Sequence, residues 1–334
     1  MILPRVGITL GDPGGVGPEI VLKAFVGGFV LPQAQYVLYG SSSFLKKEEK
    51  ALGLRFPLEI ENEKTPARPG VPALHDLPVP PGSWKIGSPS AVNGLASFRY
   101  FEAAVDDARK GKIQALVTAP ISKASWALAG IRWKGHTDYL SRFYPGVIMA
   151  FWSDRLKVAL LTHHLPLKAA LKKVTRENLE KFFIMLHRNL KMGKAGGFEF
   201  LVAGLNPHAG EDGLLGREEI ETIAPAVKAA RKRGLKISGP YPPDVVFRAA
   251  FGRKNVFVVA LYHDQGLIPF KLAAFESGVN VSLGLPFART SPDHGTAFDI
   301  AGKNRANPLS FVEAVRLAVA FAPPASFSHG LKSG

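Results

Sequence analysis

Three histidines occupy matching positions in this sequence, each just after a strand-like run. His164 follows KVALLT, His208 follows FLVAG and His263 follows VFVVALY. Because the carboxyl ends of neighbouring strands meet at one edge of an α/β sheet, we expect the three imidazoles to converge there. Three nitrogen ligands with an open fourth position form the pattern of a catalytic divalent metal. Three independent structural histidines are the alternative, since such wide spacing is less specific than His-Glu-x-x-His.

Residues that could assist a metal or bind a substrate surround these histidines. Four carboxylates could orient a ligand imidazole or relay protons: Glu211, Asp212, Asp244 and Asp264. Lys271, Asn280 and Arg289 bring an ammonium, an amide and a guanidinium that suit a substrate with a phosphate and a carboxylate. Ordinary surface polar residues are the alternative for each of them.

A polar stretch at 286–308, PFARTSPDHGTAFDIAGKNRANP, is rich in donors, acceptors and turn residues. A surface loop of this composition is expected to wrap a polar ligand. Its core, DHGTAFD at 293–299, offers an imidazole, a turn glycine, a hydroxyl and a carboxylate. This combination could line a nucleotide, with the imidazole beside a base and the carboxylate on ribose hydroxyls.

Two further motifs could bind an anion. ITLGDPGGVGPEI at 8–20 predicts a strand, a Gly-rich turn and a helix start whose backbone N–H groups could face an anion. It matches neither Gly-x-Gly-x-x-Gly nor a P-loop, so a plain strand-to-helix turn is an equal alternative. Side chains that could bind a phosphate follow in VTAPISK and KGHTDYL: Thr118, Lys123, His136 and Thr137.

Strand-like and helix-like segments alternate along the chain. Strands are predicted at 5–10, 35–40, 114–119, 146–151, 157–162, 198–204 and 256–262, and helices at 18–26, 90–111, 175–192, 217–234 and 310–322. This alternation favours an α/β fold with a largely parallel or mixed sheet. The Pro-rich stretch 64–83 is expected to be an extended surface connection.

Composition excludes several classes of protein. The chain of 334 residues has no cysteine, which excludes a disulfide scaffold, a thiolate nucleophile and a Cys-ligated metal. No apolar run approaches the length of a membrane helix and no signal-peptide core is visible, so we expect a cytoplasmic protein. The net charge of +15 is spread over short clusters without a nucleic-acid-binding motif, so a solvated basic surface and an anionic substrate are favoured over nucleic acid.

Seven blocks in order resemble the signatures of the 4-hydroxythreonine-4-phosphate dehydrogenases, the PdxA family of vitamin B6 biosynthesis. The blocks are GDPGGVGPEI, VTAPISK, GHTDYL, THHLPL, NPHAGEDGLLGREE, YHDQGLIPFK and GVNVSLGLPFARTSPDHGTAFDIAG. HGTAFDIAGKNRANP also resembles the nucleotide loop of isopropylmalate and isocitrate dehydrogenases. The resemblance implies two α/β/α domains with a mixed sheet rather than a Rossmann fold. We expect a cofactor-binding domain at 1–125 plus 272–334, and a central domain at 126–271 with the metal ligands and the dimer interface.

The resemblance also implies roles for individual residues. His164, His208 and His263 match the metal ligands, one of which comes from the partner subunit of a homodimer. The matches to substrate contacts are His136, Thr137, Lys271, Asn280 and Arg289. The matches to the dinucleotide loop are Asp293, His294, Gly295, Ala297 and Asp299. Lys271 is a candidate proton acceptor, with a metal-bound water and Asp244 as alternatives.

The implied reaction is oxidation of 4-(phosphooxy)-L-threonine by NAD or NADP, followed by decarboxylation to 3-amino-2-oxopropyl phosphate. Relatives act on threonate or erythronate 4-phosphate or on cyclic dihydrodiols, so these substrates are alternatives. Three imidazoles favour Zn²⁺ or Co²⁺ over Mg²⁺, with Mn²⁺ also possible. THHLPL has two adjacent histidines where the family usually has one; we choose His164 over His163 because it directly precedes Leu-Pro-Leu.

Overall fold

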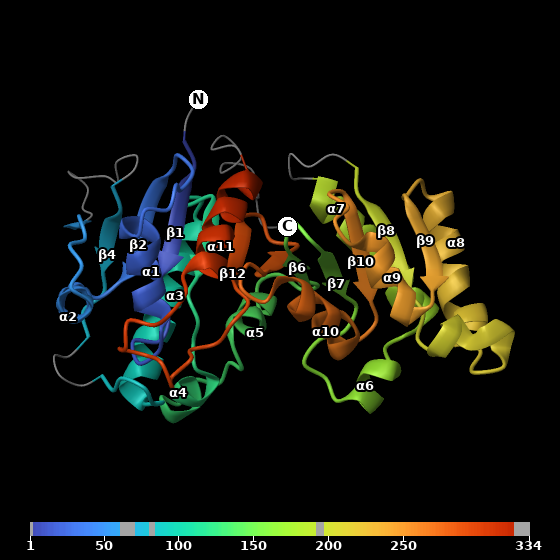
Figure 1. Ribbon diagram of the computed structural model, residues 1–334, viewed down its shortest axis with the longest axis horizontal. Helices are drawn as coiled ribbons and strands as arrows, with labels where there is room; N and C mark the ends of the chain where they lie inside the picture. Colours follow the sequence, from blue (N-terminus) through green and yellow to red (C-terminus); the bar gives the residue numbers. More distant parts are fainter. Residues whose placement is uncertain (1–2, 61–70, 80–83, 192–196, 324–334) are drawn as a thin grey trace. The chain divides into compact units, whose positions relative to one another are not determined.

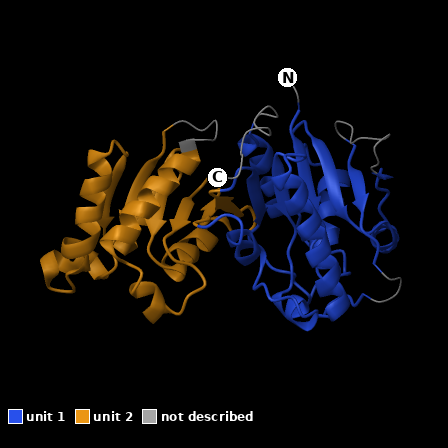
Figure 2. Ribbon diagram, turned by 180° about the vertical axis from the view of Figure 1, so that it is seen from behind, with its two compact units in different colours: residues 1–145, 285–334 blue, residues 146–284 orange. Residues whose placement is uncertain are grey.

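The computed structural model describes residues 3–60, 71–79, 84–191 and 197–323 (Figure 1). The chain divides into two compact α/β units, which Figure 2 colours separately: unit 1 is residues 1–145 and 285–334, and unit 2 is residues 146–284. The expected α/β class is confirmed. No described helix is both long and apolar enough to cross a membrane.

The boundaries of the units differ from those expected, 125/126 and 271/272. Residues 126–145 belong to unit 1 because Trp126 and Tyr139 pack against Phe98 and Phe101, which lie on a long helix of that unit. Residues 272–284 belong to unit 2 because the strand Val279–Leu283 pairs there with Ile148–Trp152.

Unit 1 contains a parallel sheet with the strand order β3-β4-β2-β1-β5-β12. The strands are β1 (Arg5–Thr9), β2 (Gln35–Gly40), β3 (Glu59–Ile60), β4 (Ala73–Asp76), β5 (Ala115–Thr118) and β12 (Ala288–Pro292). The helices are α1 (Gly17–Val26), α2 (Ser42–Leu52), α3 (Ala91–Arg109), α4 (Lys123–Leu128), α5 (His136–Ser141) and α11 (Leu309–Phe321). The chain moves from β1 to β2 in one direction and from β4 to β5 in the other, so right-handed crossovers place α1 and α3 on opposite faces.

Unit 2 contains a mixed sheet with the strand order β11-β6-β7-β10-β8-β9, in which β6 is antiparallel to β11 and β7. The strands are β6 (Ile148–Trp152), β7 (Lys157–Leu160), β8 (Glu199–Ala203), β9 (Ile237–Tyr241), β10 (Val256–Ala260) and β11 (Val279–Leu283). The helices and helical turns are α6 (Leu167–Leu171), α7 (Arg176–Lys191), η1 (Pro207–Gly213), the π-helical turn η2 (Glu219–Ile223), α8 (Ala224–Lys232), α9 (Pro243–Ala250) and α10 (His263–Ala274). Helices α9 and α10 pack onto the strands around Val258, Leu201 and Phe270, which form the core of this unit.

Two expectations about polar stretches need correction. Part of 64–83, expected as a surface connection, forms β4, which pairs with β2 and buries Leu74 completely; residues 64–70 and 80–83 lie outside the described residues. The stretch 286–308 is not all surface loop, because its first part forms β12 beside β5 with Arg289 only 3% exposed. The Nη2 atom of this buried arginine is hydrogen-bonded to neighbouring side chains, as described below.

Candidate functional site

Two of the three predicted metal ligands come together within unit 2. His164 follows β7 and His263 is the first residue of α10, and their ring centroids lie 5.7 Å apart. Two imidazoles that share a tetrahedral ion, each nitrogen about 2 Å from it, have a similar separation. The donor set and the spacing of this pair therefore fit a divalent ion.

The imidazole of His263 also has an orienting carboxylate. Its Nδ1 atom lies 2.7 Å from Oδ1 of Asp264. When Asp264 is ionised, Nδ1 donates its proton to the carboxylate, which leaves the lone pair on Nε2 for a metal. Of the four carboxylates singled out in the sequence, Asp264 is the one bonded to a candidate ligand.

His208 lies in the turn η1, which also belongs to unit 2, and its side chain is 66% exposed. Among the described residues, no three His, Asp or Glu side chains form a group that could hold a metal. A single chain thus brings His164 and His263 together but does not complete the expected convergence of three imidazoles. The nearest carboxylate to His208 is Glu211, whose Oε2 atom lies 4.0 Å from Nδ1, beyond hydrogen-bond reach.

Two of these candidate ligands have an uncommon backbone conformation. The φ angles of His164 and His208 are +49° and +53°. A positive φ is uncommon outside glycine, although histidine, asparagine and aspartate adopt this left-handed region more often than other residues do. Such conformations concentrate at functional sites, so their occurrence at both histidines supports a functional role for these turns.

The neighbouring histidine, His163, has a different environment. It is half-buried, its Nδ1 atom has no hydrogen-bond partner, and burial together with the nearby His263 lowers its pKa. It lines a pocket of about 440 Å³ in unit 2 together with apolar side chains such as Leu160 and Phe182. His164 is exposed, and its choice over His163 as the ligand stays a prediction.

Unit 1 brings together two of the predicted substrate residues. Arg289, on β12, donates through Nη2 to the Thr118 hydroxyl at 2.6 Å, and the same atom lies 3.1 Å from Nδ1 of His136. Because an arginine can only donate, Nδ1 of His136 must be the acceptor, which places the ring proton on Nε2. Thr118, considered as a phosphate ligand from the sequence, is fully buried and its hydroxyl oxygen is used by Arg289.

The His136 ring is held in a neutral state with a free donor. It packs against Phe101 with ring centroids 4.4 Å apart, and burial followed by the charge of Arg289 holds its pKa well below the ordinary value. Burial also lowers the pKa of Arg289, to about 10, so the guanidinium is still charged at neutral pH. The Nε2 atom of His136 is buried without a hydrogen-bond partner, so it is available to an acceptor atom of a ligand.

The other predicted substrate and proton-transfer residues are Thr137, Asn280, Lys271 and Asp244. Thr137 follows His136 in α5, and its carbonyl accepts from the Ser141 hydroxyl. In unit 2, Asn280 lies on β11 with a buried Oδ1 atom that has no hydrogen-bond partner, so it can accept from a ligand. Lys271 of α10 has its ammonium 5.9 Å from the Phe275 ring, and Asp244 is exposed in the first turn of α9.

The Gly-rich turn after β1 supports another loop instead of presenting N–H groups to an anion. The N–H groups of Asp12, Gly14, Gly15 and Val16 are all bonded within the protein. Val16 donates to the carbonyl of Thr296 at 2.9 Å, and a Cβ atom on Gly15 would come within 2.8 Å of Thr296. The strand-to-helix alternative therefore holds, and the glycine is required because the turn packs directly against the 293–299 loop.

The predicted dinucleotide residues lie on this supported loop. The backbone N–H of Asp293 donates to the Ser310 hydroxyl, and His294 has a buried Nε2 atom without a partner. A Cβ atom on Gly295 would meet open space, and Ala297 has a φ of +43°. Asp299 is exposed. A loop that is fixed at its ends and carries an unpartnered imidazole nitrogen and an exposed carboxylate could hold a ligand such as a dinucleotide.

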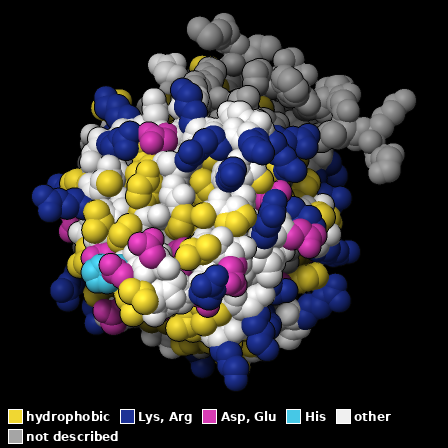
Figure 3. Space-filling view, turned by 90° about the vertical axis from the view of Figure 1, so that its right-hand side faces the viewer, with side chains coloured by type: hydrophobic (Ala, Val, Ile, Leu, Met, Phe, Trp, Pro, Cys, Tyr) yellow, Lys and Arg dark blue, Asp and Glu magenta, His cyan; other side chains and the backbone are white. Residues whose placement is uncertain are grey.

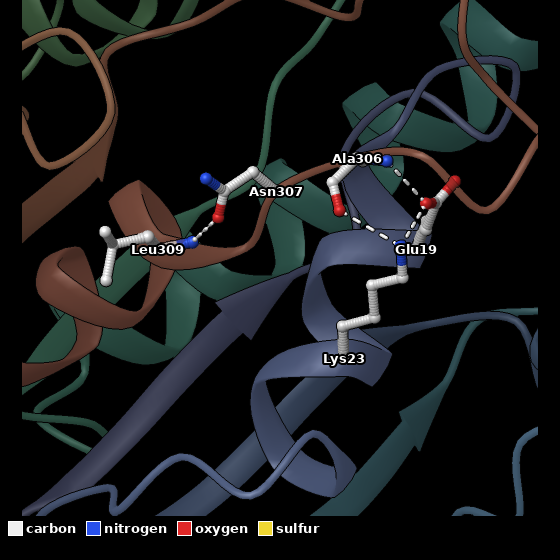
Figure 4. Close-up of polar contacts among 5 residues, drawn as sticks. All are labelled: Glu19, Lys23, Ala306, Asn307 and Leu309. Atoms are coloured by element: carbon white, nitrogen blue, oxygen red, sulfur yellow. Dashed lines mark hydrogen bonds and ion pairs between the residues drawn. The ribbon is translucent and has the colours of Figure 1, made fainter.

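The loop is also fastened at its far end by a carboxylate that sequence reasoning missed. Glu19, in the first turn of α1, accepts from the backbone N–H of Ala306 at 2.8 Å and from Lys23 at 2.7 Å (Figure 4). Lys23 in turn donates to the carbonyl of Ala306, and the Asn307 side chain accepts from the N–H of Leu309 as α11 begins. An acidic residue in the first helical turn is the usual sign of a helix start, so this second contact has no sequence pattern of its own.

The basic charge of the chain does not form a stripe on the face drawn in Figure 3. Lys and Arg side chains there alternate with hydrophobic and acidic ones. Several of the basic side chains of unit 2 are paired with carboxylates, for example Arg176 with Glu180 and Lys181 with Glu177. This distribution is that of a solvated surface.

Comparison with known proteins finds similar sequences and structures over nearly the whole chain. The family described as "Pyridoxal phosphate biosynthetic protein PdxA" matches residues 32–318. The 4-hydroxythreonine-4-phosphate dehydrogenase of Aquifex aeolicus is 44% identical over 321 residues, which cover 94% of this chain and 97% of the relative. The crystal structure of the enzyme of the same name from Klebsiella pneumoniae has a TM-score of 0.86 at 36% identity and covers 96% of this chain and 98% of its own. A terephthalate 1,2-cis-dihydrodiol dehydrogenase from Burkholderia xenovorans has a TM-score of 0.65 at 27% identity, covering 95% of this chain and 98% of its own.

Proposed function

This chain belongs to the PdxA family of dehydrogenases, and from that premise we propose that it oxidises 4-(phosphooxy)-L-threonine with NAD or NADP and a divalent metal ion. The product, 2-amino-3-oxo-4-(phosphooxy)butanoate, loses carbon dioxide to give 3-amino-2-oxopropyl phosphate, a precursor in the biosynthesis of pyridoxal 5′-phosphate. The observation that carries the proposal is the nearly full-length match, at 44% identity, to a relative named for this activity.

The residues on unit 1 suit an anionic group such as a phosphate or a carboxylate. Arg289 offers a buried guanidinium and His136 a fixed Nε2–H donor, and a phosphate or carboxylate can accept from both. Burial strengthens these bonds because water competes less for the donors. Thr137 is the third residue of this group, and the 293–299 loop, which follows Arg289 in the sequence, would hold the dinucleotide.

The residues on unit 2 suit the metal-dependent oxidation of an alcohol. When bound, the dinucleotide accepts the hydride and the metal ion polarises the substrate hydroxyl. His164, His208 and His263 would hold the ion, preferably Zn²⁺ or Co²⁺, with Asp264 fixing the His263 ring. Asn280 would accept a hydrogen bond from the substrate, and Lys271 is our first choice of proton acceptor, ahead of Asp244.

We propose that the active protein is a homodimer whose partner subunit completes the metal site. Helix α10, which begins at His263, has an apolar stripe of Ile268, Leu272 and Phe275, which are 61%, 85% and 74% exposed. Their spacing of four and three residues puts them on one face of the helix. An exposed stripe of this kind, on the helix that carries a candidate ligand, is suited to contact a second copy.

A substrate panel tests the assignment. The panel holds 4-(phosphooxy)-L-threonine, threonate and erythronate 4-phosphates and a cyclic cis-dihydrodiol, each with NAD and with NADP. We expect the highest kcat/KM for 4-(phosphooxy)-L-threonine. A higher kcat/KM for the dihydrodiol would favour the activity named for the Burkholderia xenovorans relative, and a preference for threonate or erythronate 4-phosphate would reassign the substrate.

A further inference from the structure

The turn that carries His208 has an unfavourable, left-handed backbone conformation. Five consecutive residues, from His208 to Asp212, have φ angles between +43° and +85°, and four of them are not glycine. A run of left-handed residues is disfavoured in an L-chain because each Cβ atom crowds the backbone. Such a run persists only where surrounding contacts impose it.

The contact that holds this turn is a buried carboxylate. Glu219 is 3% exposed, and its Oε1 atom accepts from the backbone N–H groups of Leu205 at 2.6 Å and Asn206 at 2.8 Å. Its Oε2 atom accepts from the side-chain amide of Asn206 at 2.9 Å. These bonds fix the two residues that precede Pro207, immediately before the left-handed run.

The same carboxylate packs directly beneath the turn. A Cβ atom added to Gly210 would lie 2.8 Å from Oε2 of Glu219, and one added to Gly204 would lie 3.2 Å from Oε1. Glu219 also begins the π-helical turn η2, an uncommon helix form that recurs at functional sites. Glu219 is buried, whereas its neighbours Glu218 and Glu221 are exposed.

The imidazole of His208 depends on this backbone for its direction. Its side chain is 66% exposed, and the nearest carboxylate, that of Glu211, lies beyond hydrogen-bond distance at 4.0 Å. An imidazole without an orienting bond is directed by its own backbone and rotamer. A change in the turn would therefore displace the ring directly.

We propose that Glu219 is a positioning residue that sets the left-handed turn and thereby aims His208 at the metal. This role rests on the proposed function, because it takes His208 as a metal ligand. It predicts that loss of the carboxylate weakens metal binding by the folded protein, although Glu219 does not touch the metal.

The test measures Co²⁺ binding from its visible absorption, and Zn²⁺ binding by competition, for the full chain with Glu219→Gln. The substitution keeps the shape of the side chain but replaces an oxygen with an NH₂ group that cannot accept from the amide of Asn206. We expect Co²⁺ affinity to fall about tenfold or more, the usual effect of losing a residue that supports a ligand. The control is Glu221→Gln, an exposed glutamate two residues away in η2 that pairs with Arg217; its affinity should match the wild type.

A second variant covers the case in which Glu219→Gln does not fold. Asn206→Ala removes the side-chain bonds to Glu219 and Glu218 but leaves both backbone bonds to the Glu219 carboxylate, and Glu218→Gln controls for the Glu218 bond. Its Tm should stay near that of the wild type while its Co²⁺ affinity falls several-fold. If the folded variants bind Co²⁺ as tightly as the wild type, or if Glu221→Gln loses as much affinity, the positioning role is wrong.

His208→Ala separates this inference from the proposed function. If His208→Ala binds Co²⁺ as tightly as the wild type, the histidine is not a ligand and the metal assignment fails. If His208→Ala loses binding while folded Glu219→Gln and Asn206→Ala keep it, the metal assignment stands and only the role of Glu219 is overturned.

Discussion

The Nη2 atom of Arg289 lies 3.1 Å from Nδ1 of His136 and 2.6 Å from the Thr118 hydroxyl. One buried guanidinium thus fixes the tautomer of the imidazole beside it and leaves the Nε2–H as a donor. The sequence motifs indicate Arg289 and His136 separately as substrate contacts, but the hydrogen bond between them makes these two residues act as a unit.

Arg289→Lys should disrupt this unit. A lysine cannot reproduce the planar fork of donors, so Thr118 and His136 lose their shared partner. Loss of a charge-assisted hydrogen bond in a buried site costs about 1.5–3 kcal/mol, so we expect kcat/KM for the phosphorylated substrate to fall roughly 10- to 100-fold. The control is Arg316→Lys on α11, whose arginine pairs with Glu313 at the surface. Unchanged kinetics of Arg289→Lys would contradict the role of this pair in substrate binding.

The pKa of His136 predicts how stability depends on pH. Because its pKa in the folded protein is lowered, the unfolded chain takes up a proton near pH 6.5 that the folded protein does not. Stability should therefore decrease as the pH falls below about 6.5, by up to about 1.4 kcal/mol per pH unit for this group. Thermal unfolding of metal-free protein at pH 7.5 and 5.5 should show a smaller loss for His136→Asn than for the wild type. An equal loss in both proteins would show that His136 does not titrate in this way.

Asp264→Asn should weaken metal binding without unfolding the protein. The asparagine cannot serve as the anionic acceptor for Nδ1 of His263, so the ring loses its fixed tautomer. We expect Co²⁺ affinity to fall about 10- to 100-fold while the Tm changes little, because the Asp264 side chain is 73% exposed. Glu276→Gln, an exposed substitution just after α10, is the control. Wild-type affinity in Asp264→Asn would remove the support for His263 as a ligand.

Leu272→Glu should convert the proposed homodimer to monomers. It places a charge in the middle of the apolar stripe on α10, where burial against a second copy would leave that charge unpaired. Sedimentation velocity should show a dimer for the wild type and for Leu128→Glu, an exposed position on α4, and a monomer for Leu272→Glu. A wild-type monomer would contradict the proposed homodimer, and a Leu272→Glu dimer as tight as the wild type would place the interface elsewhere.

The sequence predicts those parts of the fold that have strong local patterns. The seven predicted strands are all present, because runs such as VFVVALY at 256–262 are continuous and β-branched, as buried parallel strands require. Helix α10 was missed because Gly266 and Pro269 interrupt its pattern. Strand β12 was missed because Arg289 and Thr290 look like surface residues, and only the distant partners Thr118 and Ala314 make their burial possible.

The same reasoning holds for the candidate site. Strand ends indicate which histidines could share a metal, and His164 and His263 do lie together. The left-handed turn at His208 and the carboxylate of Glu219 beneath it were not foreseen, since Glu219 is eleven residues away and resembles an ordinary residue of a helix start. Supporting residues of this kind follow from three-dimensional contacts and have no sequence pattern of their own.

The most direct test of the account is turnover of 4-(phosphooxy)-L-threonine by protein stripped of metal with a chelator and then reloaded. We predict that stripping abolishes the formation of NADH or NADPH, that Zn²⁺ or Co²⁺ restores it, and that carbon dioxide is released in equal amount to the reduced dinucleotide. Full activity in the stripped protein, or reduced dinucleotide formed without carbon dioxide, would contradict the proposed metal-dependent oxidation and decarboxylation.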